Sequence, residues 1–574
     1  MDALFSQEKE DEAMEFSTDQ LAAINESFDN DLIITGIAGS GKSMVLAERI
    51  IHLVKNHPEH GSIAFFTFIN TLANQTREYL KSRGIDLDEE KITITTIDKE
   101  VEKLVNTYGT PFPGKDRHFN VSYELYRAVR KALKEEHPEY FKKSLRFRTD
   151  DWNRFCMDEL KWMKGHDIEN LEEYRICPRF GRGKLSPTPA EQKLIYKLYE
   201  AYFSQPIVED AFVDTYCNIL IKALAKNRNL IPKEDKYDYV FVDEAQDFSL
   251  NRMLLVKFIT NKHLTLAYDE AQQIFDTGDV WHEMNLFKYE AAHHSISGNY
   301  RNTVEIYELG KDLLAHNTAL SPDYYPNVVP TGHGNKPLLY AFSNEEAEVD
   351  GVAKLAMDLA KKHPDATIGL LASRTALAQK VRFHMYHNYN VITDLLSSGE
   401  DYSLTEPGIK VGAISGSKGL EFDYVICSFL EQERIPGIKK IDAELYEDSC
   451  NKGRNMLYVG ITRARKGVIL TYCSDAIYSK SKILNDFDPD HYEPMGLAKE
   501  SIHNRIAQKV LTKDDYGSLV GLSVTHKIFN HGVIESADPT KKTVTILFDT
   551  GTRSVYPEAA LYKGAFTVEG NEDE

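Results

Sequence analysis

Cysteine is scarce in this 574-residue sequence, which has six and no C-x-x-C pair. This scarcity argues against a disulfide framework and against a zinc site built on paired cysteines. No run of 18 apolar residues occurs, so no transmembrane helix is expected. The acidic first 16 residues also lack the apolar core of a signal peptide. We therefore expect a cytoplasmic protein without a membrane partner, whose thiols are idle in a reducing compartment.

Positive charge is in deficit as well. The chain has 68 Lys and Arg against 88 Asp and Glu, a formal net charge of −20. A field of this sign repels nucleic acid at long range, which excludes a general polyanion-binding protein but leaves room for a local basic channel. Hydrophobic residues make up 42% and charged residues 27%, as in an ordinary globular protein.

Short apolar runs alternate with helical patterns along most of the chain. Helices are expected at 43–55 and 71–82, between the first strands. The expected strands are 31–36, 62–68, 91–96, 236–247 and 264–270, and then 336–342, 366–373, 409–415, 423–429 and 467–473. Strands that alternate with helices form parallel sheets covered on both faces. The predicted fold class is α/β, with two units in tandem.

Other regions depart from this pattern. Residues 118–197 have 17 Lys and Arg against 13 Asp and Glu, with interleaved aromatics, and are expected to be helical. Residues 517–567 show short β patterns, with turns at 530–532 and 549–551, typical of a small all-β barrel. The predicted organisation is an acidic lead (1–16), a first unit (17–99 and 200–290) with an insertion (100–199), a second unit (291–484), a linker (485–516), the barrel, and an acidic tail (568–574).

The segment GIAGSGKS, residues 36–43, fits the phosphate-binding pattern G-x-x-x-x-G-K-[ST]. It follows an expected strand and opens an expected helix, which is the context this pattern needs. Lys42 would reach the β and γ phosphate oxygens, and Ser43 would offer its hydroxyl to Mg²⁺. The backbone N–H groups that would surround the phosphate belong to a loop that includes Gly36, Gly39, Ser40 and Gly41.

A strand ending in two acids supplies the second half of this predicted nucleotide site. In YVFVDEAQD, residues 239–247, four apolar residues lead to Asp243 and Glu244. Asp243 would bind Mg²⁺, directly or through water. Glu244 would be the base that polarises the attacking water.

Eight segments, in order along residues 17–475, resemble the motifs of the UvrD/PcrA/Rep group of superfamily-one helicases. They are STDQLAAI (17–24), FTFINTLANQ (66–75), TTIDK (95–99), DEAQD (243–247), AYDEAQQIF (267–275), GNYRN (298–302), GSKGLEFD (416–423) and MLYVGITRAR (456–465). The resemblance implies two tandem RecA-like P-loop domains that use ATP and Mg²⁺. It implies a 3′–5′ DNA helicase acting in DNA repair, replication or defence.

The resemblance also assigns roles to single residues. Gln20 would read adenine, Tyr300 would stack on it, and Glu421 would meet the ribose. Gln272 would lie near the γ-phosphate, with Arg301 and Arg463 as arginine fingers. Because the fingers come from the second unit, ATP would close the cleft between the units.

The expected nucleic-acid partner is single-stranded DNA, with RNA possible. By motif position it would contact Phe68, Asn70, Thr96 and Phe275. The insertion would roof the strand with its aromatics and a basic stretch containing Arg175, Arg179, Arg182 and Lys184. The alternative is that these aromatics form the insertion's own core and that the basic stretch is a solvated loop.

Several features depart from the family pattern. Asp98 stands where the family has His, and the base-stacking Trp expected after Phe275 is missing. Between the LLASRTALAQ motif at 370–379 and the next motif near Ile409 lie some thirty residues, too few for the family's second accessory domain. These changes favour a stripped translocase, or one regulated by a partner.

The terminal barrel resembles the Tudor-like barrel of UvrD and PcrA, which implies contact with RNA polymerase; a structural cap is the alternative. Two further functions remain open. One is an ATP-driven remodeller of RNA polymerase or another complex, as in HelD-like proteins. The other is the ATPase subunit of an anti-phage system that pairs with a separate nuclease, because the sequence has no nuclease motif.

Overall fold

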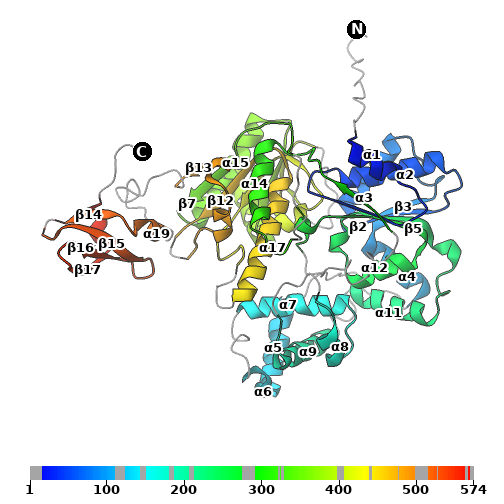
Figure 1. Cartoon of the computed structure of the whole chain (residues 1–574), viewed down its shortest axis with the longest axis horizontal. Coiled ribbons are helices and arrows are strands. Elements are labelled where there is room, and N and C mark those ends of the chain that lie inside the picture. The colour runs from blue at the N-terminus through cyan, green and yellow to red at the C-terminus, as the bar shows by residue number, and fades with distance from the viewer. Residues whose placement is uncertain are drawn as a thin grey trace, which may run out of the picture.

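The computed structural model describes most of the chain (Figure 1). The described residues are 16–109, 123–142, 150–179, 186–205, 213–274, 291–320, 324, 329–396, 406–437, 443–475, 477–497, 515–526, 528–562 and 566–568. They form two parallel sheets, a helical insertion and a small antiparallel sheet. The predicted α/β fold with two tandem units and a terminal β module is confirmed. The acidic lead and the acidic tail lie almost wholly outside the described residues.

The first sheet has six parallel strands in the order β3-β2-β4-β5-β1-β6. The strands are β1 Leu32–Gly36, β2 Ile63–Thr67, β3 Ile92–Thr96, β4 Tyr237–Val242, β5 Thr260–Tyr268 and β6 Ala292–Ile296. Apolar strands such as β2 are buried throughout, as expected where helices cover both faces.

Helices cover both faces of this sheet, and a separate apolar core fills the space on each side. One face carries α1 Thr18–Asn25, α2 Lys42–Asn56 and α3 Asn70–Ser82. The other carries α4 Ile97–Tyr108, α11 Val213–Lys226 and α12 Leu250–Phe258. Short 3₁₀ turns lie next to the strand ends: η2 Lys233–Asp235, η3 Ala245–Asp247 and η4 Glu270–Gln272.

The second sheet is also parallel, in the order β13-β7-β12-β11-β8-β10-β9. The strands are β7 Leu338–Phe342, β8 Thr367–Ala372, β9 Asp394–Leu395, β10 Gly408–Ala413, β11 Phe422–Ser428, β12 Ala464–Cys473 and β13 Glu493–Gly496. The short helices η6 Ile414–Ser417, η7 Lys482–Asn485 and η8 Pro489–His491 lie in the connections between these strands.

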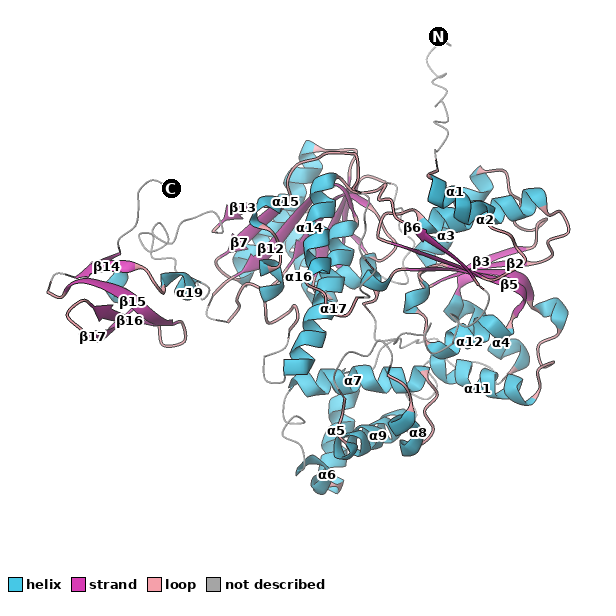
Figure 2. Cartoon of the chain, in the orientation of Figure 1, coloured by secondary structure: helices cyan, strands magenta, loops and turns pink. Residues whose placement is uncertain are grey.

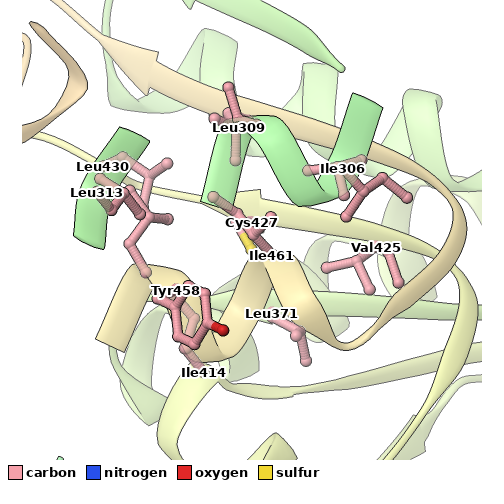
Figure 3. Packing of buried hydrophobic residues seen from close by; sticks show 14 of the residues in the cluster. Ile306, Leu309, Leu313, Leu371, Ile414, Val425, Cys427, Leu430, Tyr458 and Ile461 are labelled. Carbon is pink, nitrogen blue, oxygen red and sulfur yellow. The ribbon is translucent and has the colours of Figure 1, made fainter. Parts of the chain in front are cut away.

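Helices α14 Val304–Ala315 and α17 Ala443–Thr462 cover one face of the second sheet, and α15 Glu345–Lys362 and α16 Thr375–Tyr389 cover the other. Figure 3 shows how Leu309 of α14 and Ile461 of α17 meet Cys427 of β11 in this core. This packing fixes the end of α17, which is followed directly by the second arginine finger predicted from the motifs.

The insertion is a separate helical lobe beneath the two sheets (Figure 2). It contains α5 Tyr123–Glu136, α6 Pro138–Lys142, α7 Asp150–Gly165, α8 Leu171–Ile176 and α9 Pro189–Phe203. Its aromatics, including Trp152, Trp162 and Tyr174, are buried in a core of their own. Leu445 of α17 joins that core, so the lobe also packs against the second α/β domain.

The terminal module has its own small core and an antiparallel sheet in the order β17-β16-β15-β14-β18. Its elements are α19 Asp515–Leu519, β14 Ser523–His526, β15 Asn530–Asp538, β16 Thr543–Phe548, β17 Arg553–Pro557, α20 Ala559–Tyr562 and β18 Phe566–Val568. The turn expected at 530–532 instead precedes Asn530, which opens β15 with a φ of +59°.

Two element boundaries differ from the sequence expectation. Strand β6 joins the first sheet beside β1, beyond the expected end of the first unit at residue 290. Strand β13 lies within the expected linker and pairs with β7 at the edge of the second sheet. Both strands lack an apolar run, because an edge strand needs only backbone pairing on one side. Residues 498–514 of the expected linker lie outside the described part of the chain.

Candidate ATP site and strand-facing edge

The predicted nucleotide residues meet at one edge of the first sheet. Strands β1, β4 and β5 are neighbours and run parallel, so their carboxyl ends share an edge. The phosphate loop follows β1, Asp243 follows β4, and Asp269 follows β5. Ligands of open parallel sheets bind outside such an edge.

The phosphate loop has the backbone geometry that its glycines allow. Gly39 and Gly41 have φ of +78° and +82°, a left-handed conformation that other residues adopt only with strain. Helix α2 then begins at Lys42. The Lys42 ammonium donates to the carbonyls of Gly36 at 2.8 Å and Ile37 at 2.9 Å, and pairs with Asp269 at 3.2 Å. The lysine is therefore held inside the loop by oxygen atoms.

Ser43 and Asp243 fit a Mg²⁺ ion. Asp243 is 1% exposed and is hydrogen-bonded to the Ser43 side chain. Its Oδ1 accepts from the Glu244 amide at 2.9 Å, whereas its buried Oδ2 has no hydrogen-bond partner in the described structure. Burial and the Glu244 charge raise the pKa of Asp243 to about 7, despite Ser43 and Lys42. An unpaired carboxylate oxygen beside a hydroxyl is the oxygen donor set that Mg²⁺ prefers.

Glu244, the predicted base, has a left-handed backbone with φ of +53°. A non-glycine residue in this region costs of order 1–3 kcal/mol, and such strain clusters at functional sites. Gln246 donates to its carboxylate at 2.5 Å, and the Lys418 ammonium lies 4.0 Å away. The surroundings thus fix the direction of this carboxylate.

A chain of polar contacts crosses from the second α/β domain to the phosphate loop. Arg463, 1% exposed, donates to the Gln272 side-chain oxygen at 2.7 Å. Gln272 donates in turn to Asp269 at 2.5 Å, and Asp269 holds Lys42. Burial, and the nearby Arg301 charge, lower the pKa of Arg463 to about 10, so it remains a cation at neutral pH. The structure therefore brings together Lys42, Gln272 and Arg463.

Asp269, Tyr324 and Lys418 also take part in these polar contacts, although the motif assignments gave them no role. Tyr324, after α14, donates to Asp269 at 2.5 Å. Lys418 donates to Asp247 at 2.6 Å and to the Gln272 carbonyl at 2.5 Å. The AYDEAQ and SKGLEF segments contained the signals for Asp269 and Lys418, whereas no local pattern marks Tyr324.

Arg301 takes no part in this chain of contacts and has a different partner. Its guanidinium pairs with Glu421 at 2.6 Å, and Arg465 pairs with the same carboxylate at 2.5 Å. Burial alone would raise the pKa of Glu421, but Arg301 and Arg465 overcome it and hold the pKa at about 2. Arg301, the predicted finger, and Glu421, the predicted ribose contact, thus form an ion pair with each other.

The predicted adenine contacts flank the phosphate loop. Gln20 caps α1 together with Ser17 and donates to the Ser40 carbonyl at 2.9 Å. The Tyr300 amide donates to the Gly39 carbonyl at 2.9 Å, and the Tyr300 side chain is 57% exposed. An exposed ring beside the loop is available for stacking.

The predicted strand contacts lie at the carboxyl ends of β2 and β3, on the same sheet edge. Phe68 is half-buried against the first-domain core, and Asn70 begins α3. Thr96 is buried, and its hydroxyl caps α4 by accepting from the Lys99 amide at 3.5 Å. Phe275 lies outside the described residues.

Asp98, where the family has His, is a buried structural acid. It lies 3.1 Å from the Arg252 guanidinium, which also faces Asp214 at 3.6 Å. Burial would lower the pKa of Arg252, but the two acids raise it. Asp98 therefore joins α4 to α11 and α12, beneath the edge that the strand would cross.

The basic stretch of the insertion is partly neutralised. Arg175 pairs with Glu172 at 2.6 Å, and Arg179 pairs with the buried Glu159. Arg182 and Lys184 lie outside the described residues. Together with the buried aromatics, these pairs support the interpretation of the insertion as a lobe with its own core. None of the helices that the structure describes has the length and apolarity to cross a membrane.

The comparisons with known proteins agree with the family resemblance. Residues 16–286 match the model of the UvrD/REP helicase N-terminal domain, and residues 386–475 match that of the UvrD-like helicase C-terminal domain. Together these regions cover more than half of the chain.

Three relatives illustrate the range of sequence identity and coverage. The "Probable DNA helicase II homolog" of Mycoplasma capricolum is 22% identical over 61% of this chain and 48% of its own length. The "ATP-dependent DNA helicase Rep" of Buchnera aphidicola subsp. Baizongia pistaciae is 25% identical over 53% of this chain and 43% of its own length. The chain thus spans about half the length of these relatives.

A third relative is matched over most of both chains. The "Probable DNA helicase" of Mycoplasma pneumoniae is 22% identical over 84% of this chain and 88% of its own. With both domain models matched in order, the chain belongs to the UvrD/REP family of superfamily-one helicases.

Proposed function

We propose that this protein is an ATP-driven motor that moves along single-stranded DNA and acts as a 3′–5′ DNA helicase. The observation that carries the proposal is the contact of Arg463 with Gln272, because it joins a cation of the second domain to the phosphate half of the cleft. The names of the relatives, DNA helicase II and Rep, support DNA as the nucleic acid. The direction of travel follows the family resemblance.

The chemistry assigned to the cleft is phosphoryl transfer to water. Lys42 would turn from Asp269 to the phosphates, and Glu244 would orient and deprotonate the attacking water. Mg²⁺, held by Ser43 and Asp243, would neutralise phosphate charge. Arg463 would stabilise the charge that develops on the γ-phosphate oxygens, guided by its contact with Gln272.

Arg301 would reach the γ-phosphate only after leaving Glu421, which would then be free to meet the ribose. This exchange of partners would couple ATP binding to a movement of the second domain. Several contacts already cross the cleft, from Tyr324, Lys418 and Arg463 to the first domain. Closing and reopening of this cleft would advance the motor along a strand held by both domains.

The test is ATP hydrolysis with and without single-stranded DNA, at fixed low salt because phosphate contacts are salt-sensitive. We expect single-stranded DNA to stimulate ATP hydrolysis strongly. The same assay is carried out in parallel with single-stranded RNA. Lys42→Ala is the control, with an expected loss of about 10²–10³-fold in turnover, as for other charge-stabilising donors. Wild-type turnover by Lys42→Ala would overturn the ATP-site assignment. A rate of ATP hydrolysis that no nucleic acid changes would contradict the proposed motor function.

The terminal β module favours a second candidate, an ATP-driven remodeller of RNA polymerase or another protein complex. The module has a core of its own, built around Val524, Ile534 and Phe548. Its outer surface exposes apolar side chains, among them Val555 at 66%. Deletion of residues 517–574 is expected to spare ATP hydrolysis and to abolish RNA polymerase pull-down. Loss of folding on deletion would identify the module as a structural cap.

A further inference from the structure

Helix α1 is joined to strand β6 and the residue that follows it at both of its ends. At the amino end, Asp19 accepts from the Ser297 amide at 2.9 Å and from the Ser297 hydroxyl at 3.0 Å. At the carboxyl end, a Glu26 carboxylate oxygen lies 2.7 Å from Nε2 of His294. Ser297 directly follows β6. Helix α1 is therefore fixed to the segment through which the chain leaves the first sheet.

Helix α1 is also fixed to helix α2, which begins at Lys42 of the phosphate loop. The Arg49 guanidinium of α2 is fully buried and donates to the Ala23 and Ile24 carbonyls, each at 3.1 Å. It also lies 4.0 Å from the ring centre of Phe28, shortly after α1. The position of α1 beside the phosphate loop is thus set by contacts other than those with β6.

Gln20, the residue next to Asp19, has a side-chain amide of fixed orientation. Its Oε1 accepts from the Ser17 amide at 2.9 Å, and its Nε2 donates to the Ser40 carbonyl at 2.9 Å. These bonds use one of the two N–H groups and one of the two lone pairs of the amide. The second N–H and the second lone pair match N7 and the N6 amino group of adenine, whereas guanine has the acceptor O6 in place of that amino group. The amide can therefore distinguish the two purines.

Tyr300 lies three residues after Ser297 and is attached to the same loop, since its amide donates to the Gly39 carbonyl at 2.9 Å. Its ring is exposed and lies against Gly298, where an added Cβ would be 2.4 Å from the ring atom Cζ. The missing side chain of Gly298 leaves the room that the ring occupies. An exposed aromatic ring offers a face on which a base can stack.

We propose that Asp19 is a positioning residue that makes the nucleotide site selective for adenine. By binding Ser297, it sets the distance between the Gln20 amide, which reads the edge of the base, and the Tyr300 ring, which stacks on its face. Burial would raise the pKa of Asp19, but hydrogen bonds from Ser17 and Ser297 lower it. The carboxylate is therefore charged at neutral pH, and its hydrogen bonds are charge-assisted. This inference rests on the proposed function, because it takes the nucleotide to be ATP.

The test is nucleotide binding by the full-length chain, measured with fluorescent ADP and fluorescent GDP. Asp19→Ala removes both hydrogen bonds from Ser297, so the affinity for ADP should fall about 5–30-fold, the loss expected for one or two hydrogen bonds. The affinity for GDP should fall less, because only adenine has the matching pair for Gln20. The preference for ADP over GDP should therefore decrease. In ATP hydrolysis, KM should rise by a larger factor than kcat falls, since the groups assigned to the γ-phosphate are unchanged.

Glu26→Gln is the matched control, because Glu26 also joins α1 to β6 but at the end away from Gln20. It should keep the wild-type preference for ADP; an equal loss in Glu26→Gln and Asp19→Ala would contradict a specific role for Asp19. Ser297→Ala removes the hydroxyl and keeps the amide, so it should cause a smaller loss. Added to Asp19→Ala, it should change nothing further, since partners that act through each other are not additive. A fully additive loss would contradict the proposed contact.

The failures are distinguishable, because this test needs no DNA. If the wild type binds ADP and GDP equally, or if Asp19→Ala keeps the wild-type preference, the inference fails and the motor stands. If DNA does not stimulate hydrolysis, the motor fails whatever the preference for ADP. A thermal unfolding midpoint equal to that of the wild type is required of each variant. If Asp19→Ala misfolds, Asp19→Asn and Ser297→Ala decide the question through the same ratio of affinities.

Discussion

The predicted ATP cleft and the predicted strand-facing edge, which is the carboxyl end of β2 and β3, share the first domain but are built differently. In the cleft, charged and polar groups contact one another directly, as Lys42, Asp269, Gln272 and Arg463 do. At the strand-facing edge, Thr96 is occupied in capping a helix, and Phe68 is half-buried against the core. The cleft is thus an arrangement of reactive groups, whereas the edge is a scaffold whose side chains also hold the fold.

This difference follows from what each region must recognise. A triphosphate has fixed geometry, so its partners must be particular residue types at particular strand ends. A single strand bound without sequence preference needs only charge and flat apolar faces, which many residues supply. Substitutions should therefore have sharp effects in the cleft and graded effects at the edge.

The largest effect is expected from Arg463→Ala. An arginine finger contributes about 10³–10⁵-fold to turnover, so ATP hydrolysis should fall by at least about 10³-fold. Affinity for ADP should change little, because ADP lacks the γ-phosphate that the finger contacts. Steady-state hydrolysis and fluorescent-ADP binding measure the two quantities. Arg463→Lys keeps the charge without the fork, and full activity in that variant would count against bidentate contact.

Asp98→Ala should have the opposite effect, on stability and not on the strand, because Asp98 lies two residues after the predicted strand contact Thr96 yet is buried against Arg252. Removing one partner of a buried ion pair costs about 3–5 kcal/mol, and Asp214 would retain part of that stability. We expect a clear drop in the urea midpoint, while the ratio of DNA-stimulated to basal hydrolysis stays at the wild-type value. A reduced ratio with unchanged stability would instead indicate that Asp98 acts on the bound strand.

Phe68→Ala is expected to act on the strand. Stacking of a base on an aromatic ring is worth about 1–3 kcal/mol, so the DNA concentration for half-maximal stimulation should rise about 5–150-fold. Basal hydrolysis should fall less than stimulated hydrolysis. Phe258→Ala is the matched control, since Phe258 is also partly buried against the same core but lies on α12. Equal loss of basal and stimulated hydrolysis in Phe68→Ala would mean that Phe68 does not contact the strand.

The sequence predicted the strands and the cleft well, because both are encoded locally. Apolar runs revealed β1, β2 and β4, and the glycine spacing revealed the phosphate loop that follows β1. It missed β6 and β13, which are edge strands without an apolar run. It also missed Tyr324 and the partner of Asp98, since such contacts join residues more than fifty positions apart. Long-range polar pairing leaves no periodic trace in a sequence.

The smallest expected effect concerns Glu348, a buried acid on α15 in the second α/β domain. Burial and the neighbouring Glu431 raise its pKa well above the usual value, and it accepts from Thr471 and the Phe429 amide. The folded state therefore binds this proton more tightly than the unfolded chain does. Stability from this group is fully present below about pH 4.5 and is lost as pH rises through the folded pKa.

Glu348→Gln keeps the shape of the neutral acid without the titration. Relative to the wild type, the variant should become progressively more stable as pH rises above about 4.5, and the difference in thermal unfolding midpoint measured across a pH series reports this gain. Glu346→Gln, an exposed acid on the same helix, should show no such trend. A difference between variant and wild type that is constant with pH would mean that Glu348 stays charged in the fold.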